Sequence, residues 1–469
     1  MTNRWFSSSL WCNLRERALL SGLRLFVLVG LWVVTVLLAP RISWTSFLLL
    51  IGAGLLVVFW RWPLLGLIAL VVCSLVVPFE ISTGKQSTLN ITVLLLPVLL
   101  GLWAVNLVSQ KGQRLPMARP LWPLLAFVVV AVLAFIAGNQ PWLIFAQTAP
   151  IQAQLGGLAV FVLSAGAFIL AAYQVREIRG LKWLTWLFLS LGAFYIASRL
   201  IPDLRRLSGL SFQRGASDSL FWVWLTSLAF SQAVFHRDLH PAWRIGLLGL
   251  VLCTFYVALS RGRMWVSGWL PSSVAVIVTL WIGARSLRWP LLLGAGVIAV
   301  LNQLKLMSIV LSDNEYSLIT RLEAWRIVVE IIRANPVLGL GPANYYWYTP
   351  LFPILGYAVN FNSHNNYVDI LAQTGLLGLA CFLWFVLDMG RWGWQLQLRR
   401  LSSFARAYVY GALGGLSGML TAAMLGDWVL PFVYNVGLKG LRASVIGWLF
   451  LGGLIAVGNM MSEKGTHDD

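Results

Sequence analysis

The sequence is a succession of apolar blocks, each about as long as a lipid bilayer is thick. Only 11% of its 469 residues are charged and 59% are hydrophobic, whereas a soluble domain has roughly 25% charged residues. The candidate membrane spans are 23–39, 44–60, 63–79, 91–108, 121–137, 153–172, 181–198, 219–235, 243–259, 266–283, 289–302, 367–387, 408–425 and 441–457. Because an apolar helix of about 18 or more residues can cross a bilayer, we predict an all-α polytopic membrane protein with about 12–14 transmembrane helices.

The net charge and the cysteines argue against several classes of protein. A net charge of +18 in so apolar a chain is typical of basic cytoplasmic loops beside anionic lipids. Membrane lipids are therefore expected partners, and nucleic acid is not. The cysteines at positions 12, 73, 253 and 381 are scattered without CxxC spacing, which argues against a metal cluster or a disulfide framework. We expect no metal and no cofactor.

Basic residues set the expected orientation in the membrane. If the N-terminus is cytoplasmic and the blocks alternate, every inside loop carries Lys or Arg, as the positive-inside rule requires. Most of the other basic residues fall in four outside loops, among them Arg206, Arg261, Arg263 and Arg321. Positive charge on the translocated side opposes the orientation bias, so an anionic ligand held there would explain it. Solvation, or snorkelling at helix ends, is the alternative.

The longest polar interruption, residues 302–378, contains a predicted amphipathic helix. Thr320 fits the N-cap of a capping box, and Leu322 and Val329 belong to an apolar stripe at helical spacing, so this helix is expected to lie on the outer membrane surface. Arg321 then falls in the first turn, where backbone N–H groups and a guanidinium together could bind an anion. A structural arginine that satisfies loop carbonyls is the alternative.

A Gly/Pro turn and an aromatic run follow this helix. Gly339 and Gly341 indicate a tight turn that folds the loop back over the membrane, and a single Gly-rich turn is only a weak sign of phosphate binding. The aromatic rings of residues 345–348 could stack on sugars, but rings at this position are more typical of the interfacial aromatic belt.

His364 stands just before the next apolar block. At a helix N-terminus the positive end of the dipole lowers the pKa of an imidazole and favours its neutral form. A neutral histidine is suited to act as general base for a sugar hydroxyl, whereas a histidine that only caps the helix is the alternative. Asp427, at the outer end of a later block, is either a functional acid or the partner of a neighbouring arginine.

Together these motifs resemble the bacterial O-antigen ligase and O-antigen polymerase family. The resemblance is strongest over residues 250–390, and it rests on Ser260-Arg-Gly262, on Arg321 with Trp325, on Asn335-Pro-Val-Leu-Gly-Leu-Gly341, and on His364-Asn365 followed by Gly375-Leu-Leu-Gly378. Members of this family are similar in fold to membrane-embedded glycosyltransferases of the GT-C type. They transfer a glycan from an undecaprenyl diphosphate carrier to an acceptor at the periplasmic face, without a nucleotide sugar or an essential metal.

The resemblance implies roles for single residues. Arg261 and Arg321 match the diphosphate-binding arginines of the family, and His364 matches its essential histidine, which is proposed as the base. Arg206 and Arg263 are further candidates for binding the diphosphate. Supporting roles are expected for Asn365, Trp325, Gly339, Gly341 and Asp427. Arginines suit this chemistry because the leaving group is a lipid diphosphate whose departing charge they can stabilise.

The expected function is a metal-independent, ligase-like transfer of a glycan from an undecaprenyl-diphosphate-linked donor to a lipid or glycan acceptor. A polymerase of O-antigen or exopolysaccharide, or a protein O-oligosaccharyltransferase, would use the same residues. A transporter of bicarbonate or another small solute is an alternative of a different class. A transporter should carry polar groups at mid-bilayer, but the charges here stand at the ends of the apolar blocks.

The expected organisation is one membrane domain of the bacterial inner membrane. Residues 1–302 form a transmembrane helical region, residues 303–366 a periplasmic catalytic loop, and residues 367–469 the C-terminal transmembrane helices. Both termini are expected to be cytoplasmic.

Overall fold

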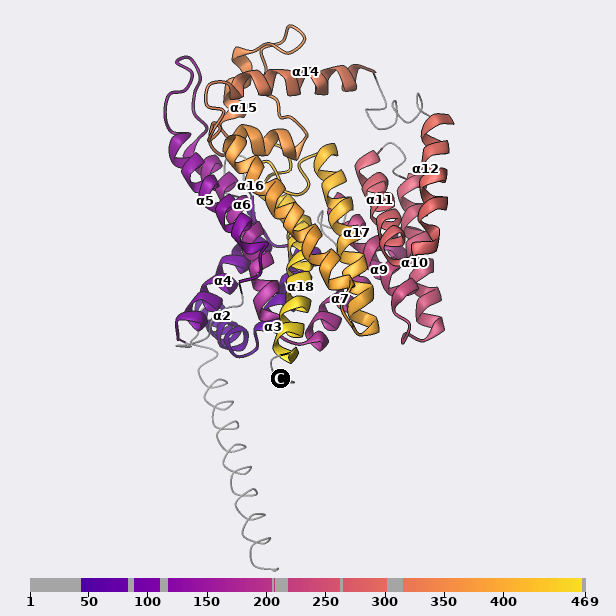
Figure 1. Cartoon of the computed structure of the whole chain (residues 1–469). Helices are drawn as coiled ribbons and strands as arrows, with labels where there is room; N and C mark the ends of the chain where they lie inside the picture. The colour runs from indigo at the N-terminus through magenta and orange to yellow at the C-terminus, as the bar shows by residue number, and fades with distance from the viewer. Residues whose placement is uncertain are drawn as a thin grey trace, which may run out of the picture. The chain divides into compact units, whose positions relative to one another are not determined.

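The computed structural model describes residues 44–82, 88–109, 117–204, 206, 218–261, 265–301 and 315–465 (Figure 1). In chain order its elements are α2 (Trp44–Arg61), α3 (Pro63–Leu75), β1 (Glu80–Ser82), β2 (Thr88–Asn90), α4 (Ile91–Ser109), α5 (Leu121–Ala137), α6 (Ile151–Gln174), α7 (Ile178–Leu200), α9 (Ser219–Phe235), α10 (Pro241–Arg261), α11 (Val266–Gly283), η3 (Arg285–Leu287), α12 (Arg288–Leu301), α14 (Glu315–Ile332), α15 (Tyr345–Tyr348), η4 (Thr349–Leu351), α16 (Asn366–Gln397), α17 (Ser403–Leu425), η5 (Gly437–Gly440) and α18 (Leu441–Gly465). β1 and β2 form an antiparallel hairpin in which Ile81 lies opposite Leu89.

The helices confirm an all-α polytopic membrane protein. The first predicted span, 23–39, lies outside the described residues, and each of the other predicted spans coincides with a helix. Among the described residues, 8 helices are long and apolar enough to cross a membrane, and shorter apolar helices accompany them. The match is close because apolar length is a local property of the sequence. The predicted boundary at 302/303 falls in residues 302–314, outside the described part of the chain.

The chain forms two compact units, Met1–Arg61 and Trp62–Asp469. In the second unit α18 is central: it packs against α6, α9 and α17, and every residue of its apolar window is buried. Glycines allow these helices to approach closely, since a side chain at Gly418 of α17 would come within 2.7 Å of the Pro271 carbonyl oxygen of α11. Small residues at helix contacts are how membrane helices pack closely in lipid.

The loops of the second unit that are described below fall into two groups at opposite ends of the helices. One end, which we call the site end, joins the 138–150, 333–365 and 426–436 loops. There the Asn344 amide donates to the Gly138 carbonyl (2.9 Å), and the Asn366 amide donates to the Leu430 carbonyl (2.7 Å). At the opposite end, the Asp238 N–H donates to the Ser403 hydroxyl. The predicted alternation of inside and outside loops agrees with these contacts, because it puts the loops of each group on the same side of the membrane.

Helix α16 is broken at Gly375, and the 336–341 segment fills the break. Gly375 has φ +67 and ψ −169, so the helix cannot form the usual bonds from N–H groups 376 and 377 to carbonyls 372 and 373. The segment satisfies all four groups: carbonyls 336 and 337 accept from N–H groups 376 and 377, and N–H groups 340 and 341 donate to carbonyls 372 and 373, at 2.9–3.2 Å. The predicted tight turn at Gly339 and Gly341 is therefore a backbone plug inside α16.

Replacing Gly375 by alanine should destabilise the protein. The added Cβ would collide with the Val337 carbonyl oxygen, and a non-glycine residue in the left-handed region costs roughly 1–2 kcal/mol. Thermal unfolding in detergent should therefore show a lower Tm for Gly375→Ala. The matched control is Gly390→Ala in the same helix, where a Cβ meets no atom within 4 Å. An unchanged Tm for Gly375→Ala would contradict the plug.

Candidate active site

Helix α14 carries Arg321 and packs against α16 at the site end (Figure 1). Two predictions about it are wrong. The helix begins at Glu315, so Thr320 is not its N-cap and Arg321 lies inside the helix, away from the N–H groups of the first turn. Leu322 and Val329, which belong to the predicted apolar stripe, are 49% and 46% exposed, so these two side chains do not lie on the buried face of the helix. A hydrogen bond of 2.7 Å from the Trp325 indole N–H to the Ser363 carbonyl ties α14 to the residue before His364.

The buried face of α14 packs on a small hydrophobic core of the loop. Its members are Ala324, Ile327, Val328, Ile331, Ile332, Leu340, Tyr345, Tyr348, Ile354, Ala372 and Phe432. The aromatic run belongs to this core: Tyr345 stacks on Phe432 and Tyr346 on Tyr434, with ring centroids 4.9 and 4.4 Å apart. These rings therefore pack on the 426–436 loop, and an interfacial belt does not describe them.

Ser363 holds the backbone on which His364 stands. Its hydroxyl donates to the buried Asp369 carboxylate (2.7 Å) and accepts from the Asn365 N–H (3.1 Å). Asn365 is the N-cap of α16, where its side chain accepts from the Tyr367 N–H (2.9 Å). With both neighbours fixed, His364 adopts φ +49. A non-glycine residue in this region is uncommon, and such conformations concentrate at functional sites.

Asp427 is connected to His364 through Asn435. Asp427 is buried, with 1% of its surface exposed. Its Oδ2 accepts from the Phe432 N–H (2.8 Å) and its Oδ1 from the Asn435 amide N–H (2.6 Å). The same amide nitrogen lies 3.3 Å from Nδ1 of His364. Burial raises the pKa of Asp427, and its hydrogen bonds with Phe432 and Asn435 oppose that rise.

Arg321 acts on His364 through its charge. The protein around the imidazole partly desolvates it, although His364 is exposed at the surface, and this desolvation lowers its pKa. The positive charge of Arg321 lowers the pKa further, and the negative charge of Asp427 opposes the shift. The predicted direction is therefore confirmed. The causes found here are desolvation and Arg321.

The other predicted residues are placed as follows. Gly339 and Gly341 belong to the plug in α16, where a Cβ at Gly339 would lie 2.5 Å from the Gly375 nitrogen. Arg261 is the last residue of α10, and its side chain lies outside the described part of the structure, as does all of Arg263. Arg206 is exposed, and within the described residues no hydrogen bond or ion pair joins it to His364. The structure thus brings together Arg321, His364 and Asp427.

Asn435 is the residue that the sequence analysis missed. It lies 71 positions after His364 and 8 after Asp427. An asparagine in a loop is usually a turn residue, and no spacing in this sequence marks Asn435 as different. Only the folded 426–436 loop brings its amide between the two ionisable groups.

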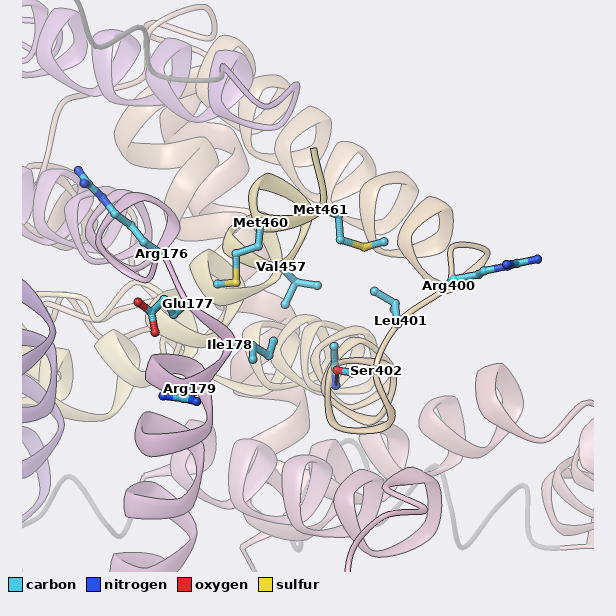
Figure 2. A pocket seen from close by; sticks show the side chains of 11 residues that line it. Arg176, Glu177, Ile178, Arg179, Arg400, Leu401, Ser402, Val457, Met460 and Met461 are labelled. Carbon is cyan, nitrogen blue, oxygen red and sulfur yellow. Dashed lines mark hydrogen bonds between the residues drawn. The ribbon is translucent and has the colours of Figure 1, made fainter. Parts of the chain in front are cut away.

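A cavity of about 700 Å³ lies at the opposite end of the helices (Figure 2). Helix α6 starts beside the 138–150 loop and ends at Gln174, next to this cavity, and its 24 residues span roughly 36 Å. Figure 2 shows that the side chains of Arg176 and Arg400 point away from the apolar side chains of Val457 and Met460. The cavity contains no residue that the sequence analysis proposed for the site.

Removing the charge of Arg321 should raise the pKa of His364. The positive charge disfavours the imidazolium, so Arg321→Gln makes protonation easier, whereas Asp427→Asn should lower the pKa by removing the opposing negative charge. A titration of the His364 ring signals by NMR measures both shifts. Arg333→Gln is the control, because Arg333 follows the same helix but is no cause of the shift. Equal titration curves for wild type and Arg321→Gln would contradict the proximity of the two groups.

Comparison with known proteins identifies a family for part of the chain. Residues 246–383 match the family model described as O-antigen ligase, and this segment contains Arg261, Arg321 and His364. Asp427 and Asn435 lie beyond it. A search of curated proteins finds no match. The matched segment runs from α10 through α14 into α16 and so includes the helix and the histidine segment of the candidate site. Residues 246–383 of this multi-pass membrane protein therefore match the O-antigen ligase family.

Proposed function

We propose that the protein transfers a glycan from an undecaprenyl-diphosphate-linked donor to a hydroxyl of a lipid or glycan acceptor. One observation carries the proposal most directly: within the O-antigen ligase segment, the hydrogen bond from Trp325 to the Ser363 carbonyl (2.7 Å) ties the helix of Arg321 to the residue before His364. A guanidinium beside a largely neutral imidazole suits a polyanionic ligand, because the guanidinium supplies charge and the ring supplies hydrogen bonding.

The reaction moves one glycosyl group between two oxygens. The bond between the anomeric carbon and the diphosphate oxygen breaks with its electron pair going to the diphosphate, and a bond forms between that carbon and the acceptor oxygen. The acceptor hydroxyl loses its proton. Negative charge therefore develops on the departing diphosphate, and preorganised donors aimed at such charge stabilise the transition state. Arg321 is the described group placed to do so, and Arg261 is proposed to assist it.

We place the site end on the periplasmic side of the bacterial inner membrane, with both termini cytoplasmic. The distribution of charge supports this orientation. The opposite end carries Arg176, Arg237 and Arg400 in short loops and Arg179 at the start of α7, and short loops rich in Arg and Lys stay in the cytoplasm. A carrier-linked glycan would then reach Arg321 from the periplasmic leaflet.

The alternatives differ in how well this geometry fits them. A polymerase or a protein O-oligosaccharyltransferase would use the same charged groups and differ only in the acceptor. A solute transporter binds its cargo midway along its helices. Arg321, His364 and Asp427 instead lie at one end of them, in α14 and in the loops before α16 and after α17, which favours transfer chemistry at the membrane surface.

Substituting Arg321 or His364 by alanine should abolish transfer without preventing membrane insertion. Loss of a group that stabilises developing charge typically lowers kcat by about 10²–10³-fold. The measurement is glycan transfer by purified protein in liposomes that contain an undecaprenyl-diphosphate-linked glycan and an acceptor lipid.

Arg333→Ala is the matched control, since Arg333 is exposed and follows the end of the same helix. Wild-type transfer by both the Arg321→Ala and the His364→Ala proteins would remove the proposed site. The identity of the group at the reducing end of the product would distinguish ligase from polymerase.

A further inference from the structure

The amide group of Asn435 bridges an acid and a histidine through a single atom. Its Nδ2 lies 2.6 Å from Oδ1 of Asp427 and 3.3 Å from Nδ1 of His364. An amide nitrogen carries two hydrogens and cannot accept a hydrogen bond. Both neighbours must therefore be acceptors in this arrangement.

Asp427 fixes the direction of the amide. With the amide rotated by 180°, the Asn435 oxygen would lie against the Asp427 carboxylate, and the two acceptors would repel each other. The amide direction in the structure is that of an ionised Asp427, because a proton on Oδ1 would instead let that oxygen donate to the Asn435 oxygen. The second oxygen accepts from the Phe432 N–H at 2.8 Å. Both carboxylate oxygens are thus occupied as acceptors, and the Asn435 N–H groups point to Asp427 and His364.

We infer that Asn435, held by Asp427, is a positioning residue that keeps His364 in the tautomer with its proton on Nε2, so that His364 meets the ligand as a hydrogen-bond donor. In a neutral imidazole one nitrogen donates and the other accepts. Nδ1 is the acceptor here, so Nε2 carries the hydrogen. His364 is exposed, and within the described residues its Nε2 has no hydrogen-bond partner, which leaves this N–H open to a ligand.

This inference rests on the proposed function and narrows the role of His364 within it. Neither ring nitrogen offers a free lone pair to the acceptor hydroxyl: Nε2 is already protonated, and Nδ1 faces an N–H. The ligand that suits an Nε2–H beside the guanidinium of Arg321 is the anionic diphosphate. In the transfer step, Nε2–H donates a hydrogen bond to a diphosphate oxygen while the anomeric C–O bond breaks. The proton of the acceptor hydroxyl passes to the departing diphosphate, which becomes the base as its charge grows.

The charged groups that act on His364 come from two different elements. Asp427 follows α17 and favours the imidazolium, and Arg321 of α14 disfavours it. The lowered pKa of His364 agrees with a ring that remains neutral near pH 7 and therefore has a defined tautomer. Asn435 lies between the ring and the acid, so its N–H blocks direct proton exchange between Nδ1 and Asp427.

The test is the tautomer itself, read by NMR of protein labelled with ¹⁵N and ¹³C at histidine and held in lipid nanodiscs. The His364 signals are identified by their loss in His364→Gln. Wild type should show the Nε2–H tautomer at neutral pH. Asn435→Asp places a carboxylate at Nδ1, so the proton should move to Nδ1 and the pKa of the ring should rise. Asn435→Ala removes the donor, so both tautomers should appear.

The matched control is Asn360→Asp, which makes the same change of charge in the 333–365 loop that carries His364, at an exposed residue whose amide donates to the Tyr346 carbonyl. It should leave the His364 tautomer as in wild type. An Nδ1–H tautomer or an imidazolium in wild type at neutral pH would overturn the inference, and so would an unchanged tautomer in both Asn435 variants.

Activity supplies an independent readout. Misplacing a catalytic group by about 1 Å can cost roughly 10²-fold in rate, so Asn435→Ala should lower kcat for glycan transfer with little change in KM. Asn435→Asp should make kcat depend on pH through the raised pKa of His364. A wild-type kcat in both variants would contradict a positioning role. If wild type shows Nε2–H but transfers no glycan, the proposed function fails while the tautomer assignment stands, so the two failures can be told apart.

Discussion

The site depends on four backbone hydrogen bonds that replace two missing bonds of a helix. At Gly375 the helix α16 opens, and carbonyls 372 and 373 and N–H groups 376 and 377 lose their partners within the helix. Unsatisfied backbone groups are especially costly in a membrane protein, and the 336–341 segment supplies a partner for each. Each bond is worth about 0.5–1.5 kcal/mol net. The segment and the break therefore hold each other in place.

This plug helps to position the site through contacts on both sides of it in the sequence. Backward along the chain, the Asn335 amide donates to the Gly339 carbonyl (2.8 Å) and fixes the end of α14. Forward along the chain, the first turn of α16 contains Asp369, whose carboxylate accepts a hydrogen bond from the Ser363 hydroxyl. Trp325 closes the loop by donating to Ser363. Arg321 and His364 are 43 residues apart in the sequence, but the positions of both depend on the same break in α16. Precise placement of this kind is what catalytic groups need from a scaffold.

The sequence predicts the helices well and the site in part. The spans are predictable because apolar length is local, and Arg321 and His364 are predictable because they stand in recognisable motifs. The N-cap at Thr320 is wrong because Tyr316 to Ile319 contain no helix breaker. A helix that is already nucleated extends through such residues at little cost. The capping-box pattern is a local signal, and it occurs here inside a longer helix.

Other features of the site are long-range and could not be predicted from local pattern. Gly339 and Gly341 read as a turn, but their role as a plug depends on a break in a helix that follows more than thirty residues later. The sequence indicates Asp427 by its position alone, and it does not indicate Asn435. Their meaning comes from one amide that faces both an acid and an imidazole, a contact that exists only after the 426–436 loop has packed on the rings of Tyr345 and Tyr346.

The central claim is that a lipid diphosphate binds between Arg321 and His364. The most direct measurement is an experimental structure of the protein in nanodiscs with a non-transferable analogue of the undecaprenyl-diphosphate-linked glycan. The account predicts that phosphate oxygens lie within hydrogen-bond distance of the Arg321 guanidinium and of Nε2 of His364. A diphosphate bound at the opposite end of the helices, beside Arg176 and Arg400, would contradict it.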